Sequence, residues 1–173
     1  MITGNQSVLD NAVDLGALGY AFSSKPIVMG GLAMEYYGLR KRGDDIDFII
    51  SDEDYQGLAE KYPNHKMDQW GDLGIVVDRC DLLRSVFRLD YDFYSEGSVE
   101  YKTCKVMSFE RLLFMKSMAF WNQPDSRKAA DDFDLAMKRY LEAYQNEDYV
   151  KRSMQYVESY LKAPDGKVFN DNY

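Results

Sequence analysis

The sequence predicts an α/β (α+β) fold, in which a mixed sheet is flanked by helices and followed by a C-terminal helical module. Three observations lead to this prediction: the 173-residue chain is 46% hydrophobic, short apolar segments with strand spacing occupy its first hundred residues, and helical spacing takes over from residue 108. A chain of this length builds a single core. We therefore place a sheet domain at residues 1–107 and a helical module at residues 108–173, packed together as one compact unit.

Each element is predicted from its spacing and its boundary residues. Apolar residues at helical spacing predict a first helix, and Pro26 separates it from a short buried strand that ends at Gly30 and Gly31. Ser51 is a suitable cap for the helix that follows the clearest strand. The expected helices cover residues 6–21, 32–39, 51–58, 108–121, 125–144 and 147–161. The expected strands cover residues 27–29, 45–50, 73–77, 82–94 and 99–106, and the tail from Ala163 is expected to fray.

Composition argues against several classes of protein. The chain carries 21 Lys and Arg against 29 Asp and Glu, and the first hundred residues alone hold 9 basic and 18 acidic side chains. An acidic protein repels nucleic acid at long range, whereas its carboxylates can hold divalent cations. A single His and two Cys exclude a structural zinc site. Because no apolar run suits a membrane span and the N-terminus lacks a secretory pattern, we expect a cytoplasmic protein without membrane contact.

One predicted strand carries two carboxylates on one face. Residues two apart on a strand point to the same side, so Asp45 and Asp47 project together while Ile46, Phe48 and Ile50 face the core. Adjacent carboxylates repel each other unless a cation lies between them. Mg²⁺ takes oxygen ligands and is usually held by one or two carboxylates plus substrate phosphates. The pattern indicates a Mg²⁺ site, and ordinary alternation on a solvent-facing strand produces the same spacing.

Gly30 and Gly31 lie where a strand turns into a helix. Backbone N–H groups at such a corner converge on an anion, and the missing Cβ atoms let a triphosphate approach the backbone. A tight turn is the alternative explanation of the pair. The order of strand, Gly-Gly, helix, basic turn and Asp-x-Asp strand favours a phosphate site and a metal site at the same edge of one sheet.

A third carboxylate is expected on a neighbouring strand. In the strand predicted over residues 82–94, Arg88, Asp90 and Asp92 share one face. We prefer Asp92, and the spacing leaves Asp90 as an alternative. Both also fit the solvent side of an ordinary amphipathic strand.

The C-terminal helices add cations. Lys116 lies in an apolar stretch, where its side chain either snorkels to solvent or extends toward a phosphate. In the next helix, the polar face opposite the apolar stripe contains Arg127, Asp131, Asp134 and Lys138. A solvated face with ion pairs four residues apart explains the same pattern.

The segment from Gly30 to Asp47 resembles the signature of the DNA polymerase β-like nucleotidyltransferase superfamily, which is Gly-Gly or Gly-Ser, roughly ten residues, and then Asp-x-Asp. Two later motifs look like the AbiEii branch, which contains abortive-infection and toxin–antitoxin nucleotidyltransferases. A Lys-x-x-Ala motif is present at residues 116–119, and a basic segment followed by Asp-x-x-Asp-Leu at residues 127–135. The resemblance covers residues 27–141.

This resemblance implies a Mg²⁺-dependent nucleotidyltransferase that moves a nucleoside monophosphate from an NTP to an acceptor in RNA, protein or a small molecule. Two Mg²⁺ ions would be held by Asp45, Asp47 and Asp92, and Asp131 would act as a base or support the metal site. The nucleotide would be bound by Gly30, Gly31, Lys116, Arg127 and Lys128. A toxin-like member would work beside an antitoxin partner.

Two alternatives stay open at this point. A catalytically inactive module could use some of the 14 tyrosines in a partner interface. An antibiotic-modifying nucleotidyltransferase is the other alternative, because an acidic surface suits a cationic acceptor.

Overall fold

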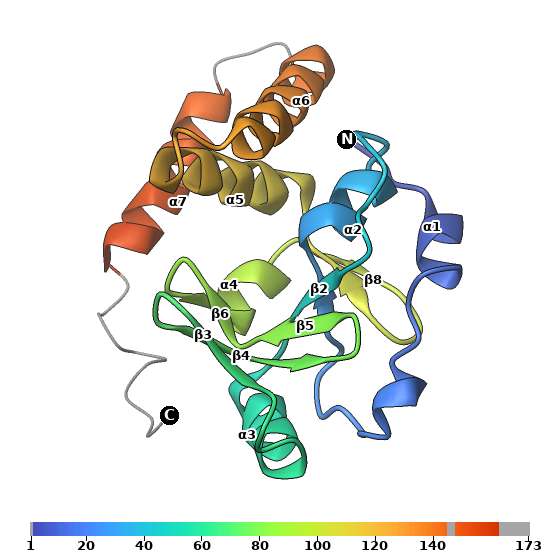
Figure 1. The fold of residues 1–173 in the computed structure, drawn as a ribbon. Helices are drawn as coiled ribbons and strands as arrows, with labels where there is room; N and C mark the ends of the chain where they lie inside the picture. Colours follow the sequence, from blue (N-terminus) through green and yellow to red (C-terminus); the bar gives the residue numbers. More distant parts are fainter. Residues whose placement is uncertain (1, 145–147, 163–173) are drawn as a thin grey trace.

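The computed structural model describes residues 2–144 and 148–162. Its helices are α1 (Gln6–Asp10), α2 (Gly30–Tyr36), α3 (Asp52–Lys61), α4 (Tyr91–Ser95), α5 (Phe109–Asn122), α6 (Arg127–Tyr144) and α7 (Asp148–Lys162), with a short 3₁₀ turn, η1 (Gly16–Leu18). Its strands are β1 (Ile27–Val28), β2 (Ile46–Ile49), β3 (Lys66–Gln69), β4 (Asp72–Val77), β5 (Cys80–Leu83), β6 (Ser85–Val86), β7 (Leu89–Asp90), β8 (Val99–Glu100) and β9 (Lys105–Val106). The predicted fold class, a mixed sheet with flanking helices and C-terminal helices after it, is confirmed (Figure 1).

Seven strands form one mixed sheet in the order β3-β4-β5-β2-β1-β9-β8, and β6 and β7 form a separate hairpin. The central strand β2 is antiparallel to β1 and parallel to β5, with Asp47 in register with Asp81. The N–H of Met29 donates to the carbonyl of Asp47 at 3.0 Å. Met29, Asp47 and Asp81 therefore lie in one row across three neighbouring strands, and α2 begins directly beside this row.

The sheet is anchored by a strand that is apolar on both sides. Ile46, Phe48, Ile49 and Ile50 are all buried, with exposed fractions between 0% and 5%. Such two-sided burial is typical of a strand at the centre of a sheet that has helices packed against it. In this sheet α2 packs against β2, and α3 packs against β4. The burial leaves Asp47 as the polar interruption of an otherwise apolar strand.

The C-terminal helices form a group above the sheet in Figure 1. Ser108 caps α5 by accepting a hydrogen bond from the N–H of Arg111 at 3.2 Å, and α5 packs along α6. The apolar stripe of α6 buries Ala129, Ala136 and Tyr140. All three predicted C-terminal helices are present, whereas the division into two domains at residue 108 stays a prediction. The predicted start of the last helix at residue 147 and the tail from residue 163 lie outside the described residues.

The helix predicted over residues 6–21 is wrong in length. It is replaced by α1 and the short turn η1, and Gly19, with a φ of +56°, ends that turn in the left-handed region. Leu9, Leu15 and Leu18 are nevertheless buried. Their spacing reflects packing against the core and not a continuous helix.

The strand predicted over residues 82–94 is also wrong. Phe87 and Arg88 both have positive φ values, of 51° and 63°, which turn the chain sharply between β6 and β7. Asp90 then caps α4 by accepting from the N–H of Phe93 at 3.3 Å. Asp92 consequently lies on a helix and is exposed, and it does not share a strand face with Asp90.

Two further differences concern the edges of the sheet. The segment predicted as one strand over residues 99–106 is the hairpin of β8 and β9. The edge strand β3 was not predicted, because its residues are mostly exposed and polar and show no apolar alternation.

Candidate functional site

The start of α2 forms a corner that is open only because residue 30 is glycine. Gly30 has a φ of +58°, and a Cβ atom at this position would stand 2.1 Å from Oδ2 of Asp47. The N–H of Gly31 donates a hydrogen bond to the Asp47 carboxylate. In this structure Asp47 thus occupies the place at the helix start where an anion is expected to bind.

Asp47 is electrostatically strained in its position. Burial raises the pKa of its carboxyl, the hydrogen bond from Gly31 and the positive charge of Lys116 oppose that rise, and the charge of Asp45 adds to it. The net pKa is above the ordinary value of 3.8. Asp45 itself lies directly before β2 and is exposed. The two predicted carboxylates are therefore close enough to influence each other, and they differ in burial.

The third carboxylate at this point of the sheet is Asp81. It stands opposite Asp47 on the neighbouring strand β5. Burial, followed by the charges of Asp47 and Asp45, raises the pKa of Asp81 to about 6. The sequence analysis missed this residue, although a signal existed: Asp81 directly precedes two leucines that are buried, much as Asp47 is flanked by buried residues in β2.

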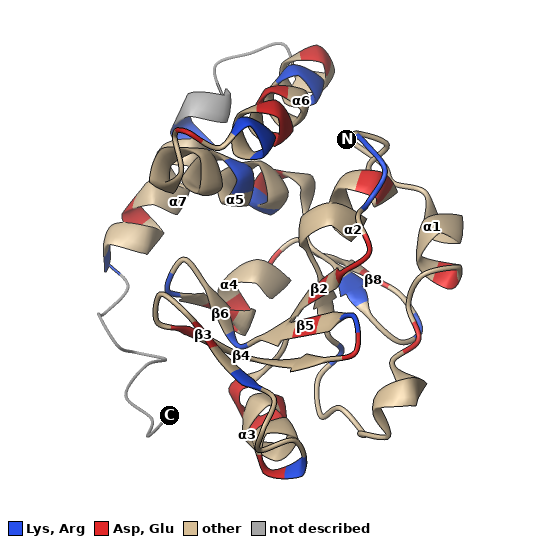
Figure 2. Cartoon of the chain, in the orientation of Figure 1, with Lys and Arg blue, Asp and Glu red and all other residues tan. Residues whose placement is uncertain are grey.

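The glycine corner and the two carboxylates in register on β2 and β5 line a cleft of about 560 Å³. Gly30, Asp47 and Asp81 form part of its wall on the side of the sheet, and α5 contributes Lys116 and Ala119. Figure 2 shows acidic segments on β2 and β5 and basic segments on α5. The cleft therefore carries opposite charges on two of its walls, an arrangement that suits a phosphate chain bound through cations.

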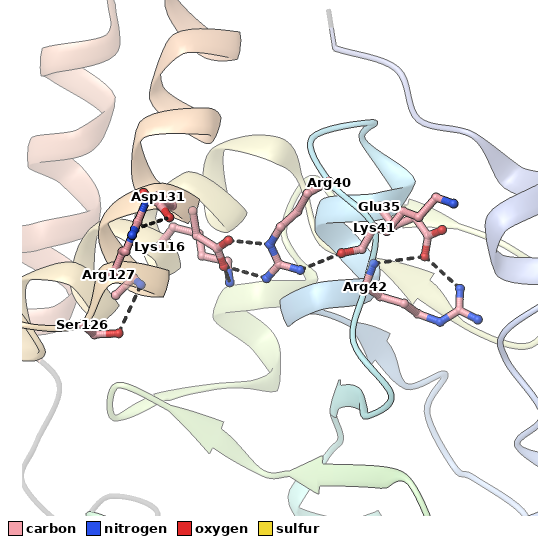
Figure 3. A network of polar contacts seen from close by, with 10 residues as sticks. Glu35, Arg40, Lys41, Arg42, Lys116, Ser126, Arg127 and Asp131 are labelled. Atoms are coloured by element: carbon pink, nitrogen blue, oxygen red, sulfur yellow. Dashed lines mark hydrogen bonds and ion pairs between the residues drawn. The ribbon is translucent and has the colours of Figure 1, made fainter.

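Lys116 is held in place by a buried carboxylate from α6. Its Nζ donates to Oδ2 of Asp132 at 2.8 Å. Arg40, in the connection after α2, donates to both oxygens of the same carboxylate, at 2.5 and 2.8 Å. Figure 3 shows Arg40 extending from this connection toward Lys116. Asp132 thereby ties α5, α6 and the segment before β2 together.

The charge balance of this cluster favours the ionised form of Asp132. Burial acts to raise the pKa of Asp132, whose residue is 3% exposed, but the hydrogen bonds and charges of Arg40 and Lys116 lower it below the ordinary value. One carboxylate between two cations leaves an excess positive charge beside the cleft. Asp132 holds both Arg40 and Lys116, so Lys116 is ordered at the wall of the cleft in the absence of a ligand.

Several predicted site residues lie elsewhere. Asp131 forms an exposed ion pair with Arg127, with 3.8 Å between the charged atoms and exposed fractions of 64% and 94%. Neither residue is part of the cleft wall, and neither is Asp92 on α4. Lys128 is exposed, yet its charge is near enough to lower the pKa of Asp47. Of the predicted residues, the structure thus brings together Gly30, Gly31, Asp45, Asp47 and Lys116. Asp131 is exposed, and the buried carboxylate is that of the next residue, Asp132.

The basic turn before β2 is also ordered by pairing. Arg42 donates to Glu35 of α2 at 2.8 Å (Figure 3). Since Arg40 is bound to Asp132, two of the three cations in this turn are used to hold the connection between α2 and β2. That connection fixes where β2, and with it Asp47, begins.

The carboxylates fit a cation that takes only part of its ligands from the protein. Among residues 2–144 and 148–162, no group of three or more Asp, Glu, His or Cys side chains forms a ready metal cage. Mg²⁺ is usually bound by one or two carboxylates together with substrate phosphates and water. Asp47 and Asp81, in register on neighbouring strands and both with a raised pKa, are oxygen donors of the kind that such an ion takes, and the charge of Asp45 adds to the rise at both.

Comparisons with known proteins add little sequence information. No protein-family model matches the chain, and no curated protein matches it. One solved structure that matches is the crystal structure of an antigenic nucleotidyltransferase-like protein from Paracoccidioides brasiliensis, with 17% sequence identity, 91% of each chain covered and a TM-score of 0.38. The resemblance to the AbiEii branch stays a prediction. In the part of the chain that the structure describes, no helix is both long and apolar enough to cross a membrane.

Replacing Gly30 by Ala is expected to damage the corner. The left-handed backbone alone disfavours Ala by about 1–2 kcal/mol, and the new Cβ would collide with Asp47. The free energy of unfolding, measured by urea denaturation, should fall by at least this amount. Gly43→Ala is the matched control, because nothing lies within 4 Å of a Cβ built there. Equal effects of the two substitutions would contradict this account of the corner.

Asp81→Asn is expected to stabilise the metal-free protein at neutral pH. The raised pKa means that ionised Asp81 opposes folding above pH 6, and that this cost disappears as the pH falls below the unfolded-state pKa of 3.8. Because Asp81 is only partly buried, so that solvent screens part of this cost, we expect a gain of roughly 1 kcal/mol. Urea denaturation at pH 7 and at pH 4 tests this, and Asp92→Asn should show no such pH-dependent gain.

Asp132→Ala is expected to destabilise the protein by about 3–5 kcal/mol, because it leaves two partly buried cations without their shared carboxylate. Asp131→Ala removes a carboxylate from the neighbouring, exposed position and should change stability by less than about 0.5 kcal/mol. Thermal unfolding of the two variants measures the contrast. A larger loss of stability from Asp131→Ala than from Asp132→Ala would show that Asp132 is not the residue that holds Arg40 and Lys116 in place.

Proposed function

We propose that this protein is a divalent-cation-dependent nucleotidyltransferase, which transfers a nucleoside monophosphate from an NTP to an acceptor. The observation that carries the proposal is the cleft in which Asp47 and Asp81, in register on neighbouring strands, face the glycine corner and Lys116. Neighbouring carboxylates beside a helix start and a fixed cation form a combination of groups that suits NTP chemistry.

Each residue has a role that follows from its surroundings. Lys116, ordered by Asp132, would bind the phosphate chain as a point charge. Gly30, which has no Cβ atom, lets the Asp47 carboxylate approach the start of α2 and so fixes the position of this proposed cation ligand. Asp45, Asp47 and Asp81 would hold Mg²⁺, which when bound neutralises charge on the triphosphate and on the leaving pyrophosphate. A two-ion arrangement, as the sequence analysis expects, is part of the proposal.

The transfer requires only the NTP and the acceptor as reactants. An acceptor oxygen or nitrogen attacks the α-phosphorus of the NTP, a bond forms between them, and the bond from the α-phosphorus to the bridging oxygen of pyrophosphate breaks. The proton that the acceptor loses passes to water, because Asp81 is assigned to the cation and its raised pKa belongs to the metal-free protein. The walls of the cleft supply positioning, which contributes much of the acceleration in phosphoryl transfer.

The acceptor is RNA, a protein or a small molecule, and an antitoxin-like partner belongs to the proposal as a consequence of the AbiEii resemblance. To identify the acceptor, NTPs labelled at the α-phosphate are incubated with the protein, Mg²⁺ and cell extract. The fraction that becomes labelled, whether nucleic acid, polypeptide or small molecule, defines the acceptor class.

Asp47→Asn is expected to lower transfer by about 100-fold or more, because it removes a negative ligand of the cation that would neutralise the triphosphate. Asp44→Asn, which alters an exposed neighbour, is the matched control and should retain activity. In wild-type protein, Mg²⁺ with at least one of the four NTPs should raise the melting temperature, since a ligand of the native state stabilises it.

The proposal fails if Asp47→Asn keeps full transfer activity. It also fails if none of the four NTPs, with or without Mg²⁺, changes the melting temperature. That second result would favour the inactive binding module.

A further inference from the structure

The end of the cleft away from the glycine corner is aromatic. Trp70, in the turn between β3 and β4, and Phe87, in the turn between β6 and β7, both line it. Tyr160 of α7 lines the same end, and the Arg88 guanidinium lies 6.0 Å from the centre of its ring. β4 and β6 are in contact, so the two turns lie side by side on the part of the sheet that faces α7 (Figure 1).

Trp70 occupies a position that local structure does not favour for tryptophan. It is 78% exposed and has a φ of +55°, followed by Gly71 with a φ of +92°. Two-residue hairpin turns of this kind normally take Asn-Gly or Asp-Gly, because side chains with a Cβ resist the left-handed region. A large exposed ring in such a position gains little from packing or from backbone preference, so another role is required to explain it.

The same backbone feature recurs at this end of the cleft. Among the described residues, four that are not glycine have positive φ, and three of them, Trp70, Phe87 and Arg88, belong to the cleft wall. Backbone held in sparsely populated regions gathers at ligand sites, where the surrounding structure maintains it.

Carboxylates on β3 and β4 maintain these two turns. Asp68 accepts from the N–H of Gly71 at 2.6 Å, directly after Trp70. Asp72 accepts from the N–H groups of Phe87 and Arg88, at 2.8 and 3.2 Å. The backbone that carries both rings is therefore ordered without a ligand, which lowers the entropic cost of stacking a flat group against them.

The aromatic end and the acidic end belong to one continuous wall. Phe87 lies six positions after Asp81 along β5 and β6, and at a rise of about 3.3 Å per residue this stretch spans at most ~20 Å. Across the sheet, the glycine corner follows β1, the carboxylates stand on β2 and β5, and the turn of Trp70 lies beyond them at the end of β4. Because both sets of residues line the same cleft, a ligand that fills the cleft contacts the carboxylates and the aromatic end together.

We propose that the aromatic end, made of Trp70, Phe87, Arg88 and Tyr160, binds a nucleobase ring by stacking, with Trp70 as the exposed platform. This inference rests on the proposed function and extends it to the base. Stacking on an aromatic side chain tolerates all four bases, because each has a π face. The base belongs either to the NTP or to the end of an acceptor strand, and the chemistry of recognition is the same.

Fluorescence of a single tryptophan tests the proposal directly. The chain contains two tryptophans, and Trp121 is 81% exposed on α5 outside the cleft wall. In the Trp121→Phe protein, Trp70 is the only tryptophan, and ATP or CTP with Mg²⁺ should quench it. Tripolyphosphate with Mg²⁺, which has no base, should bind without this quenching. A short single-stranded RNA forms a second arm, which tells a base of the acceptor from a base of the NTP.

Affinity provides the matched comparison. In the wild-type background, Trp70→Ala should weaken binding of the nucleotide or RNA that quenches Trp70 by about 5- to 150-fold and leave tripolyphosphate binding unchanged, whereas Trp121→Ala should change neither. Trp70→Asn should weaken base binding similarly while leaving the melting temperature equal or higher, since Asn fits the turn. A drop in melting temperature with unchanged base binding would assign Trp70 a structural role and overturn the inference.

The outcomes separate the two proposals. If tripolyphosphate and NTPs bind equally, and neither they nor the RNA quench Trp70, the stacking inference is overturned and the nucleotidyltransferase proposal stands. If neither tripolyphosphate nor any NTP binds to the wild-type protein, the proposed function fails and the inference fails with it. Quenching of Trp70 by RNA or NTP, together with weaker binding of the same ligand to the Trp70→Asn protein, supports the inference.

Discussion

The contact between the Asp47 carboxylate and the first turn of α2 is the constraint on which the cleft depends. It joins the central strand to the helix start through the N–H of Gly31, and it is possible only because Gly30 lacks a Cβ atom. Burial of that carboxylate raises its pKa, so the contact stores unfavourable charge in the metal-free protein. Protonation removes this cost, and under the proposed function a bound Mg²⁺ would offset it.

Behind the positive wall of the cleft, which carries Lys116, a buried carboxylate has a lowered pKa and not a raised one. Asp132 is buried as an anion between Arg40 and Lys116, and its pKa falls because these partners outweigh desolvation. Breaking such a cluster costs far more than forming it contributes, so its main effect is on geometry. It holds Lys116 against α6 and fixes the segment that leads into β2. The negative and positive walls are thereby positioned by the same connection, and the aromatic turns complete the cleft at its other end.

The sequence analysis succeeded where a local pattern controls the outcome. The Gly-Gly pair at the start of a helix, a strand that carries Asp47, Lys116 on a helix and the three C-terminal helices all follow from spacing and caps, and the structure contains each of them. Asp45, predicted on the same strand as Asp47, lies directly before it and is exposed. The prediction from sequence failed where positive φ values turn the chain, as at Phe87 and Arg88, because Phe and Arg are not residue types that indicate a left-handed turn. That error moved the expected third carboxylate to Asp92. Helical spacing also does not distinguish Asp131 from Asp132, and it is Asp132 that pairs with Arg40 and Lys116.

The residues themselves decided which segments become strands and helices, which faces are apolar, and that a glycine corner precedes a pair of carboxylates. These properties depend on neighbours a few positions away, and so they can be read along the chain. Only the tertiary structure decided that Asp81 stands beside Asp47 and that Asp132 holds Lys116 in place. It also decided that Trp70 lines the same cleft as Asp47, Asp81 and Lys116. These pairings join residues far apart in the chain, and strand register and helix packing, which bury the core as a whole, determine them.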